Sequence, residues 1–367
     1  MTRALATVLL VSAFSSSLVA SRPQTNDDDG QQLYRAACSA CHGLDGRGQP
    51  RAIVGFDTPL PDFTDCAFAT PEPDADWIAI VHQGGPIRAF DRRMPAFGEA
   101  LSEQQIRQTV RYIRTLCSDR RWPRGELNLP RALVTEKAFP ENETVVTTTV
   151  GRGGAAIFRN EVLYEQRLGA RTQVEVAVPV TAQKDANGAW QRGLGDAAFA
   201  FKQVLFHSLA SGAIVSAGAE IVVPTGNDTL ELGKGTTILE PFVAVGKILP
   251  SDGFIQLQGG FEIPWDRDDV EPEAFWRTAL GRSFLERRFG RSWTPMLEIV
   301  GAKGLDSKAS VQWDVIPQVQ VTLSRRQHIM LNAGIRVPLT NRDEHSLQLL
   351  TYFLWDWFDG GLFDGWR

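Results

Sequence analysis

The segment Cys38-Ser39-Ala40-Cys41-His42 determines the fold that we expect for the first part of this 367-residue chain. Two cysteines separated by two residues and followed directly by histidine are typical of covalent attachment of a c-type haem. Cys38 and Cys41 lie one helical turn apart, so both can form thioethers with the haem vinyl groups while His42 reaches the iron. A zinc knuckle is the alternative for an isolated motif of this kind.

Helical patterns flank the motif on both sides. Residues 30–40 are expected to form a helix that leads into it, and a final helix is expected to begin at Ser102. Ser102 and Gln105 have the spacing of a capping box, in which each side chain accepts a hydrogen bond from a backbone amide. Apolar residues then recur at helical spacing and indicate one buried face: Ile106, Val110, Ile113 and Leu116.

Residues 30–117 resemble a class I c-type cytochrome, with an N-terminal helix, CxxCH, a Gly- and Pro-rich loop over 43–63, a methionine in the turn Met94-Pro95-Ala96-Phe97-Gly98, and a C-terminal helix. The resemblance implies one covalently attached haem c, held by Cys38 and Cys41. It also implies that His42 is the proximal ligand and Met94 the distal ligand.

Ligation by histidine and methionine fills both axial positions of the iron and raises its potential. The resemblance therefore implies an electron-transfer protein and no enzyme. His82 is the rival distal ligand, and a haem enzyme such as a peroxidase would need an open iron position.

Two further cysteines, Cys66 and Cys117, lie outside the motif. An even leftover pair in an exported protein favours a disulfide. Two free buried thiols are the alternative.

The N-terminus has the features of a secretory signal over residues 1–21, with Arg3, a short apolar run and a small-residue end. The apolar run is too short to span a bilayer, and a buried N-terminal helix is the alternative. The polar residues 22–29 are expected to be disordered. A net charge of −5 indicates no nucleic-acid partner.

Residues 118–142 carry several arginines and prolines and lack sustained periodicity, so we expect an ordered linker packed on one or both neighbouring units. The simpler interpretation is a solvated connector. Contact with a membrane surface through the basic, Trp-containing part is the alternative.

Residues 143–367 alternate between apolar and polar side chains. In 254–265, for example, Ile255, Leu257 and Phe261 alternate with Gln256 and Gln258. About twelve such segments occur, each roughly 10 to 14 residues long, which exceeds the usual globular strand and suits tilted membrane-spanning strands. The pattern predicts an antiparallel transmembrane β-barrel of about twelve strands.

Two other features favour an outer-membrane barrel over a soluble sandwich or lipocalin-like barrel. Connections alternate between short and long, and tryptophans gather near the ends of segments, as an interfacial girdle requires: Trp190, Trp265, Trp276, Trp293, Trp355 and Trp357. The pattern resembles outer-membrane barrel proteins found with phenol-degradation pathways, in which strands run into turns like Pro224-Thr225-Gly226.

Charged residues at polar positions of these strands are expected to line the lumen: Glu220, Glu240, Glu262, Asp314 and Arg336. A salt-bridge network that supports the wall is preferred for them over a transport pathway.

The expected protein is a monohaem cytochrome anchored in outer-membrane lipid, with its haem domain in the periplasm and periplasmic redox proteins as partners. A single haem cannot carry electrons across an apolar band about 25 Å tall. The alternative is a narrow channel whose haem domain serves as a plug, gate or docking module.

Overall fold

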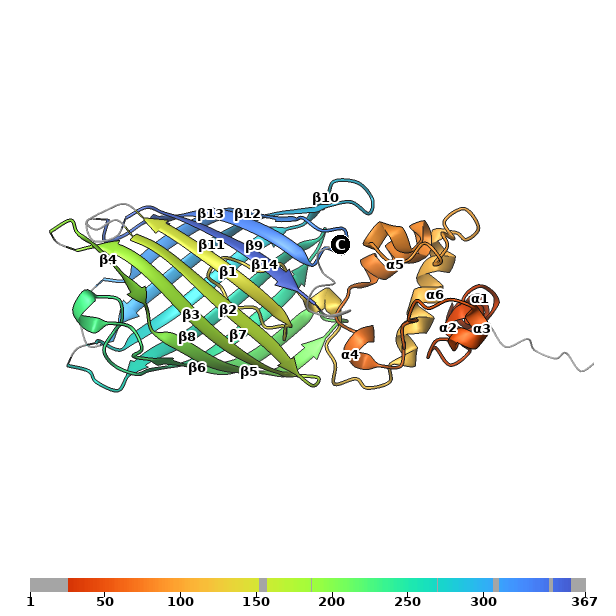
Figure 1. Ribbon diagram of the computed structural model, residues 1–367, viewed down its shortest axis with the longest axis horizontal. Coiled ribbons are helices and arrows are strands. Elements are labelled where there is room, and N and C mark those ends of the chain that lie inside the picture. The colour runs from red at the N-terminus through yellow and green to blue at the C-terminus, as the bar shows by residue number, and fades with distance from the viewer. Residues whose placement is uncertain are drawn as a thin grey trace, which may run out of the picture.

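The computed structural model describes residues 26–151, 157–185, 187–268, 270–305, 310–342 and 346–357, and Figure 1 shows a helical unit at one end of a β-barrel. The expected signal peptide over 1–21 lies outside the described residues. Within the described residues no helix is both long and apolar enough to cross a membrane.

The helical unit contains six α-helices and one 3-10 helix before residue 118: α1 Asn26–Ala37, α2 Ser39–His42, α3 Arg51–Val54, α4 Cys66–Ala69, α5 Asp74–Gln83, η1 Gly85–Arg88 and α6 Glu103–Leu116. The capping box of Ser102 and Gln105 is present at the start of α6. The expected face of that helix is buried, since Ile106, Val110 and Ile113 are each less than 5% exposed.

Helix α1 begins inside the segment expected to be disordered. Residues 26–29 are helical, which corrects that expectation for these four positions. The cause is close packing on α6: a Cβ on Gly30 would lie 2.3 Å from the backbone oxygen of Gln108. The Gln108 amide also donates to Asp29 at 3.4 Å. Only glycine allows the two helices to approach this closely.

The second unit is a closed antiparallel barrel. Its strands are β1 Glu143–Gly151, β2 Ile157–Leu168, β3 Thr172–Lys184, β4 Trp190–Leu194, β5 Ala197–Ser208, β6 Ala213–Val223, β7 Ile238–Leu249, β8 Gly253–Pro264, β9 Glu273–Arg282, β10 Phe284–Leu285, β11 Ser292–Gly304, β12 Gln312–Thr322, β13 Ile329–Pro338 and β14 Gln348–Asp356. Strand β14 pairs with β1, and β11 pairs with β9, so the sheet closes. Strands β4 and β5 pair with successive parts of β3 and so share one position in the ring. Strands β9 and β10 share one position beside β11 in the same way. The fourteen strands therefore occupy twelve positions, as expected.

Burial in the barrel is inverted relative to a soluble protein. On β8 the apolar Leu257 and Phe261 are 41% and 48% exposed, whereas Gln256 and Gln258 are 1% and 7% exposed. The polar faces of the strands therefore point into the lumen and the apolar faces point outward. A soluble sandwich would bury the apolar faces instead, so the transmembrane barrel expected from the sequence is confirmed.

The connection between the units is packed on both of them, as an ordered linker should be, but it is not the solvated connector preferred over membrane contact. After the 3-10 helix η2, Gly125–Leu127, the chain enters the barrel. We call residues 125–141 the lumenal plug. Leu127, Ala132 and Phe139 are each at most 2% exposed, and Glu141 is fully buried. Its charged side chains are not solvated, because they pair with the barrel wall and with each other.

Replacing Gly30 with valine tests the contact between α1 and α6. We expect Gly30→Val to lower the stability of the helical unit by about 1–3 kcal/mol, because the added side chain meets a backbone oxygen that cannot move aside. Thermal unfolding followed by circular dichroism measures this loss. Ala36→Val is the control on an exposed face of the same helix and should cost only about 0.5 kcal/mol. Equal losses in the two variants would contradict the packing argument.

Candidate functional site

The two cysteines of the CxxCH motif lie in one helical turn. The Cys38 carbonyl accepts hydrogen bonds from the backbone amides of Cys41 and His42, at 3.2 and 2.9 Å. Neither Cys38 nor Cys41 is in a disulfide. Cys38 belongs to the core of the helical unit, and burial raises the pKa of its thiol to about 11. Both sulfurs are therefore available for thioether bonds.

The imidazole of His42 has the properties of a neutral metal ligand. Its ring stacks on Phe63 with 4.9 Å between centroids. Burial lowers the pKa of His42 to about 4, so the ring is neutral at pH 7. Its Nδ1 atom is buried and has no hydrogen-bond partner among the described residues. The hydroxyl of Tyr34 donates to the Gly43 carbonyl at 2.7 Å and fixes the turn that follows the motif.

Met94 lies in the expected turn and packs against the same core as Cys38 and Phe63. The backbone amide of Gly85 donates to the Met94 carbonyl at 3.0 Å. A side chain at Gly84, where φ is +81°, would come within 2.9 Å of that carbonyl oxygen, so glycine is required there. The helical unit therefore holds the methionine loop by its backbone.

His82, the rival distal ligand, is engaged elsewhere. Its ring lies 5.2 Å from that of Phe289, a residue of the barrel, and its Nδ1 is 2.8 Å from the Gln83 amide nitrogen. These contacts place His82 at the junction of the two units.

The residues of this site fit a covalently bound haem. Two free thiols and a neutral imidazole with an orphaned nitrogen lie in one short segment. Cys38 and the Met94 thioether pack in one apolar core, and His42 stacks on Phe63 of that core. Cys38 and Cys41 would hold the group, and His42 and Met94 would ligate its iron. The haem would supply one-electron redox chemistry.

The remaining cysteines, Cys66 and Cys117, form a disulfide, as expected from the leftover pair. The bond joins α4 to the end of α6. On the same helix α6 the guanidinium of Arg114 lies 4.1 Å from the centre of the Trp77 ring and donates to the Glu72 carbonyl at 2.7 Å.

Direct contacts join the helical unit to one end of the barrel. His328 lies 2.8 Å from the Glu72 carboxylate, and Arg88 donates to the Phe289 carbonyl at 2.9 Å. The backbone amide of Gly125, at the start of the lumenal plug, donates to the Thr70 carbonyl at 2.7 Å. Contacts from three separate segments fix the helical unit on the barrel.

Ion pairs hold the lumenal plug to the wall. Arg131 lies 2.7 Å from Glu143 on β1 and 2.9 Å from Glu165 on β2. Lys137 pairs with Glu141, and it lies 3.4 Å from Glu143.

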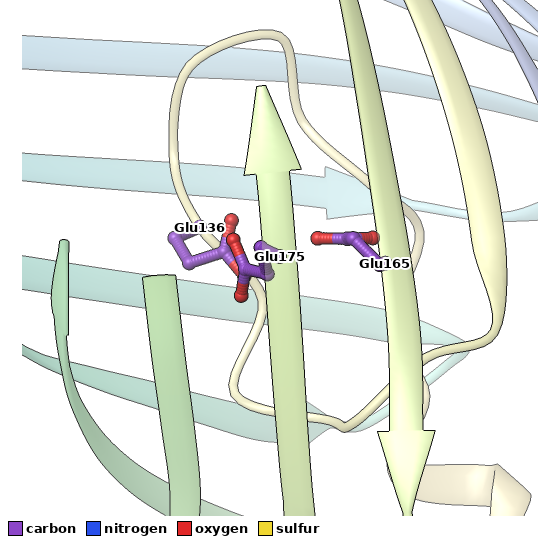
Figure 2. Close-up of side chains that lie close together, drawn as sticks. All are labelled: Glu136, Glu165 and Glu175. Atoms are coloured by element: carbon purple, nitrogen blue, oxygen red, sulfur yellow. The ribbon is translucent and has the colours of Figure 1, made fainter. Parts of the chain in front are cut away.

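A second group of carboxylates meets around β3. Figure 2 shows Glu136 of the plug beside Glu175, with Glu165 on the neighbouring strand, and one carboxylate oxygen from each lies within 4.8 Å of the others. Lys202 of β5 pairs with Glu136 and lies 3.7 Å from Glu175. The lysine and Arg131 thus neutralise part of this cluster, so we assign no metal ion to it.

The opposite wall binds the backbone of the plug. The carboxylate of Glu298 on β11 accepts hydrogen bonds from three consecutive amides, those of Leu133, Val134 and Thr135, at 3.0, 3.2 and 2.7 Å. Glu298 is fully buried. A buried carboxylate with three charge-assisted bonds is a strong anchor.

The expected lumen residues face inward, and their environments differ. Glu220, Glu240 and Glu262 line a cavity of about 700 Å³ that the plug closes at one end. Asp314 and Arg336 instead form a wall ion pair, with the Arg336 Nε 2.8 Å from the carboxylate. Reasoning from the sequence missed the plug residues Arg131, Glu136 and Lys137. The only local signal was the charge and apolar content of a Pro-rich linker.

Each of the two units has similarity to known proteins. Residues 25–113 match the family model described as cytochrome C oxidase, cbb3-type, subunit III. No curated protein matches the chain. An outer membrane channel from Pseudomonas putida F1 is 15% identical with a TM-score of 0.46, covering 62% of this chain and 100% of its own. KdgM porin is 9% identical with a TM-score of 0.41, covering 59% of this chain and 99% of its own. NanC porin is 7% identical with a TM-score of 0.41, covering 58% of this chain and 99% of its own. Residues 25–113 thus form a cytochrome c domain, followed in the chain by a twelve-stranded barrel.

Proposed function

We propose that this chain is a monohaem c-type cytochrome anchored in the outer membrane, which transfers electrons on the periplasmic side. The observation that carries the proposal is the fixed junction between the two units. The cytochrome domain contacts both the plug and the wall through Gly125, Phe289 and His328. A domain held in this way stays at one mouth of the barrel.

In this proposal Cys38 and Cys41 attach a single haem, and His42 and Met94 fill the axial positions of its iron. A filled iron passes electrons and leaves no open position for a substrate. Electron transfer is thus favoured over an enzymatic activity such as that of a peroxidase.

The barrel serves in this proposal as an anchor. Its outward face is apolar, with Phe199, Phe201 and Phe206 each at least 50% exposed, which suits contact with lipid. The plug fills the end of the lumen beside the cytochrome domain, so the haem domain itself is not the plug. This closed lumen favours an anchor over an open channel.

The lengths of the connections support a periplasmic haem domain. The turns at its end of the barrel include the short segments 169–171 and 250–252, whereas 224–237 and 265–272 are at the opposite end. Outer-membrane barrels have short periplasmic turns and longer outer loops. The donors and acceptors are then periplasmic redox proteins.

Replacing Met94 tests the ligand assignment. We expect Met94→Ala to abolish the long-wavelength methionine–iron band of the oxidised protein and to lower the reduction potential, because methionine as axial ligand raises it. Visible spectroscopy and a redox titration measure both. His82→Ala is the control and should keep the band, since His82 contacts Phe289. A band that survives in Met94→Ala would refute the assignment.

Cysteine labelling tests the orientation. In the proposed state the four native cysteines are bonded, so a new cysteine is the only free thiol. We expect a membrane-impermeant maleimide to label Arg267→Cys, in an outer loop, on intact cells. Glu99→Cys, at an exposed position of the cytochrome domain, should be labelled only after the outer membrane is opened. The reverse pattern would place the haem domain outside the cell.

A further inference from the structure

The strand register places carboxylates directly opposite one another along the lumen. At the end beside the cytochrome domain, Asp356 of β14 is opposite Glu143 of β1, which is opposite Glu165 of β2. Glu165 is in turn opposite Glu175 of β3. We call these four residues the inner carboxylates. All four are buried.

The same row continues after one interruption. Glu175 is opposite Ala200 of β5, and Ala200 is opposite Glu220 of β6, which faces Glu240 of β7. The paired residues on either side, Leu239–Ile263 and Phe242–Gly260, put Glu240 opposite Glu262 of β8. Glu262 is opposite Glu273 of β9. We call Glu220, Glu240, Glu262 and Glu273 the outer carboxylates.

The row connects the two ends of the barrel. Neighbouring strands lie about 4.8 Å apart, and strands in barrels tilt by about 40°, so a row perpendicular to the strands climbs as it passes around the wall. Eight steps between the nine strands β14 to β9 climb roughly 25 Å, which equals the height of the apolar band of an outer-membrane barrel. Like charges directly opposite each other destabilise a sheet, so this row needs a compensating cation.

Cations of the plug already supply that compensation at the inner half. Arg131 binds Glu143 and Glu165, and Lys137 binds Glu143. From the wall, Lys202 reaches Glu175, and His328 lies 3.1 Å from Asp356. The inner carboxylates are therefore positions at which the protein binds cationic groups.

The outer carboxylates lack such partners. Among the described residues, no ion pair involves Glu220, Glu240, Glu262 or Glu273. The basic side chain that faces them from β9 is Arg277, which donates at 3.3 Å to the Val134 carbonyl of the plug. Glu220, Glu240 and Glu262 line the cavity of about 700 Å³. This cavity is acidic, because nine acidic and four basic side chains line it.

A second cavity, of about 240 Å³, lies at the other end of the row and is lined by Glu143 and Asp356 together with Glu72 of the cytochrome domain. Arg131 lines both cavities. The plug thus separates two cavities that one row of carboxylates connects.

We infer that the lumen is a path for small cations. The plug closes this path at Arg131, and its side chains Arg131 and Lys137 take the place of mobile cations at the inner carboxylates. Rings of Asp and Glu side chains select cations in channels because their field attracts cations and repels anions. This inference does not depend on electron transfer by the haem.

Conductance in planar bilayers tests the path, with a KCl gradient across purified full-length protein. We expect little conductance from the wild type. Replacing residues 129–138 by a glycine-serine segment of equal length removes the plug and keeps the tether to the cytochrome domain. This variant should conduct K⁺ severalfold better than Cl⁻, as its reversal potential reports. Glu298→Ala, which removes the acceptor for three plug amides, is the second opening variant in case the first fails to fold.

Charge-matched variants then test the row within the opened background. The triple variant Glu220→Gln, Glu240→Gln and Glu262→Gln should lose most of the preference for K⁺. The control neutralises three acids of the same cavity that lie off the row, Glu161→Gln, Asp228→Asn and Glu231→Gln, and should retain the preference. A pore that prefers Cl⁻, equal losses in the two triple variants, or folded opening variants without conductance would each overturn the inference. The haem spectrum and heat-modifiable electrophoretic migration establish that each variant is folded.

Discussion

The ion pairs of Arg131 with Glu143 and Glu165 are the interaction on which the arrangement of the two units depends. A carboxylate buried in a barrel lumen needs a partner, and removing one member of a buried pair costs about 3–5 kcal/mol. The chain meets this need with its own preceding segment. Because that segment is held in the lumen, the chain leaves the barrel at a fixed point, and residues 124–126 bind the cytochrome domain there.

This geometry separates the task of the haem from that of the barrel. The cytochrome domain lies against one mouth of the barrel (Figure 1), and the apolar band of such a barrel is about 25 Å tall. The sequence has a single CxxCH motif, which provides one point of haem attachment, at one end. The electron transfer that we propose therefore takes place on the side of the cytochrome domain, and the barrel fixes the position of that domain.

Local features of both units could be predicted from the sequence. The CxxCH motif, the Ser102–Gln105 capping box and the alternation of the strands each depend on residues within a few positions, so spacing alone reveals them. The plug could not be predicted in this way, because Arg131 pairs with the wall and Lys202 of the wall pairs with Glu136 only once the segment 125–141 lies inside the lumen. The carboxylate row depends likewise on the register of nine strands.

The same contacts decide how firmly the lumen is sealed. Glu298 binds three consecutive amides of the plug, and the Tyr352 hydroxyl donates to the Arg131 carbonyl at 2.6 Å. Withdrawing the plug would break these bonds together with the ion pairs, leaving buried carboxylates without partners. The electron transfer that we propose for the cytochrome domain requires no such movement. In the cation path that we infer, the plugged lumen is the closed state, and opening it requires cations that replace Arg131 and Lys137 at the inner carboxylates.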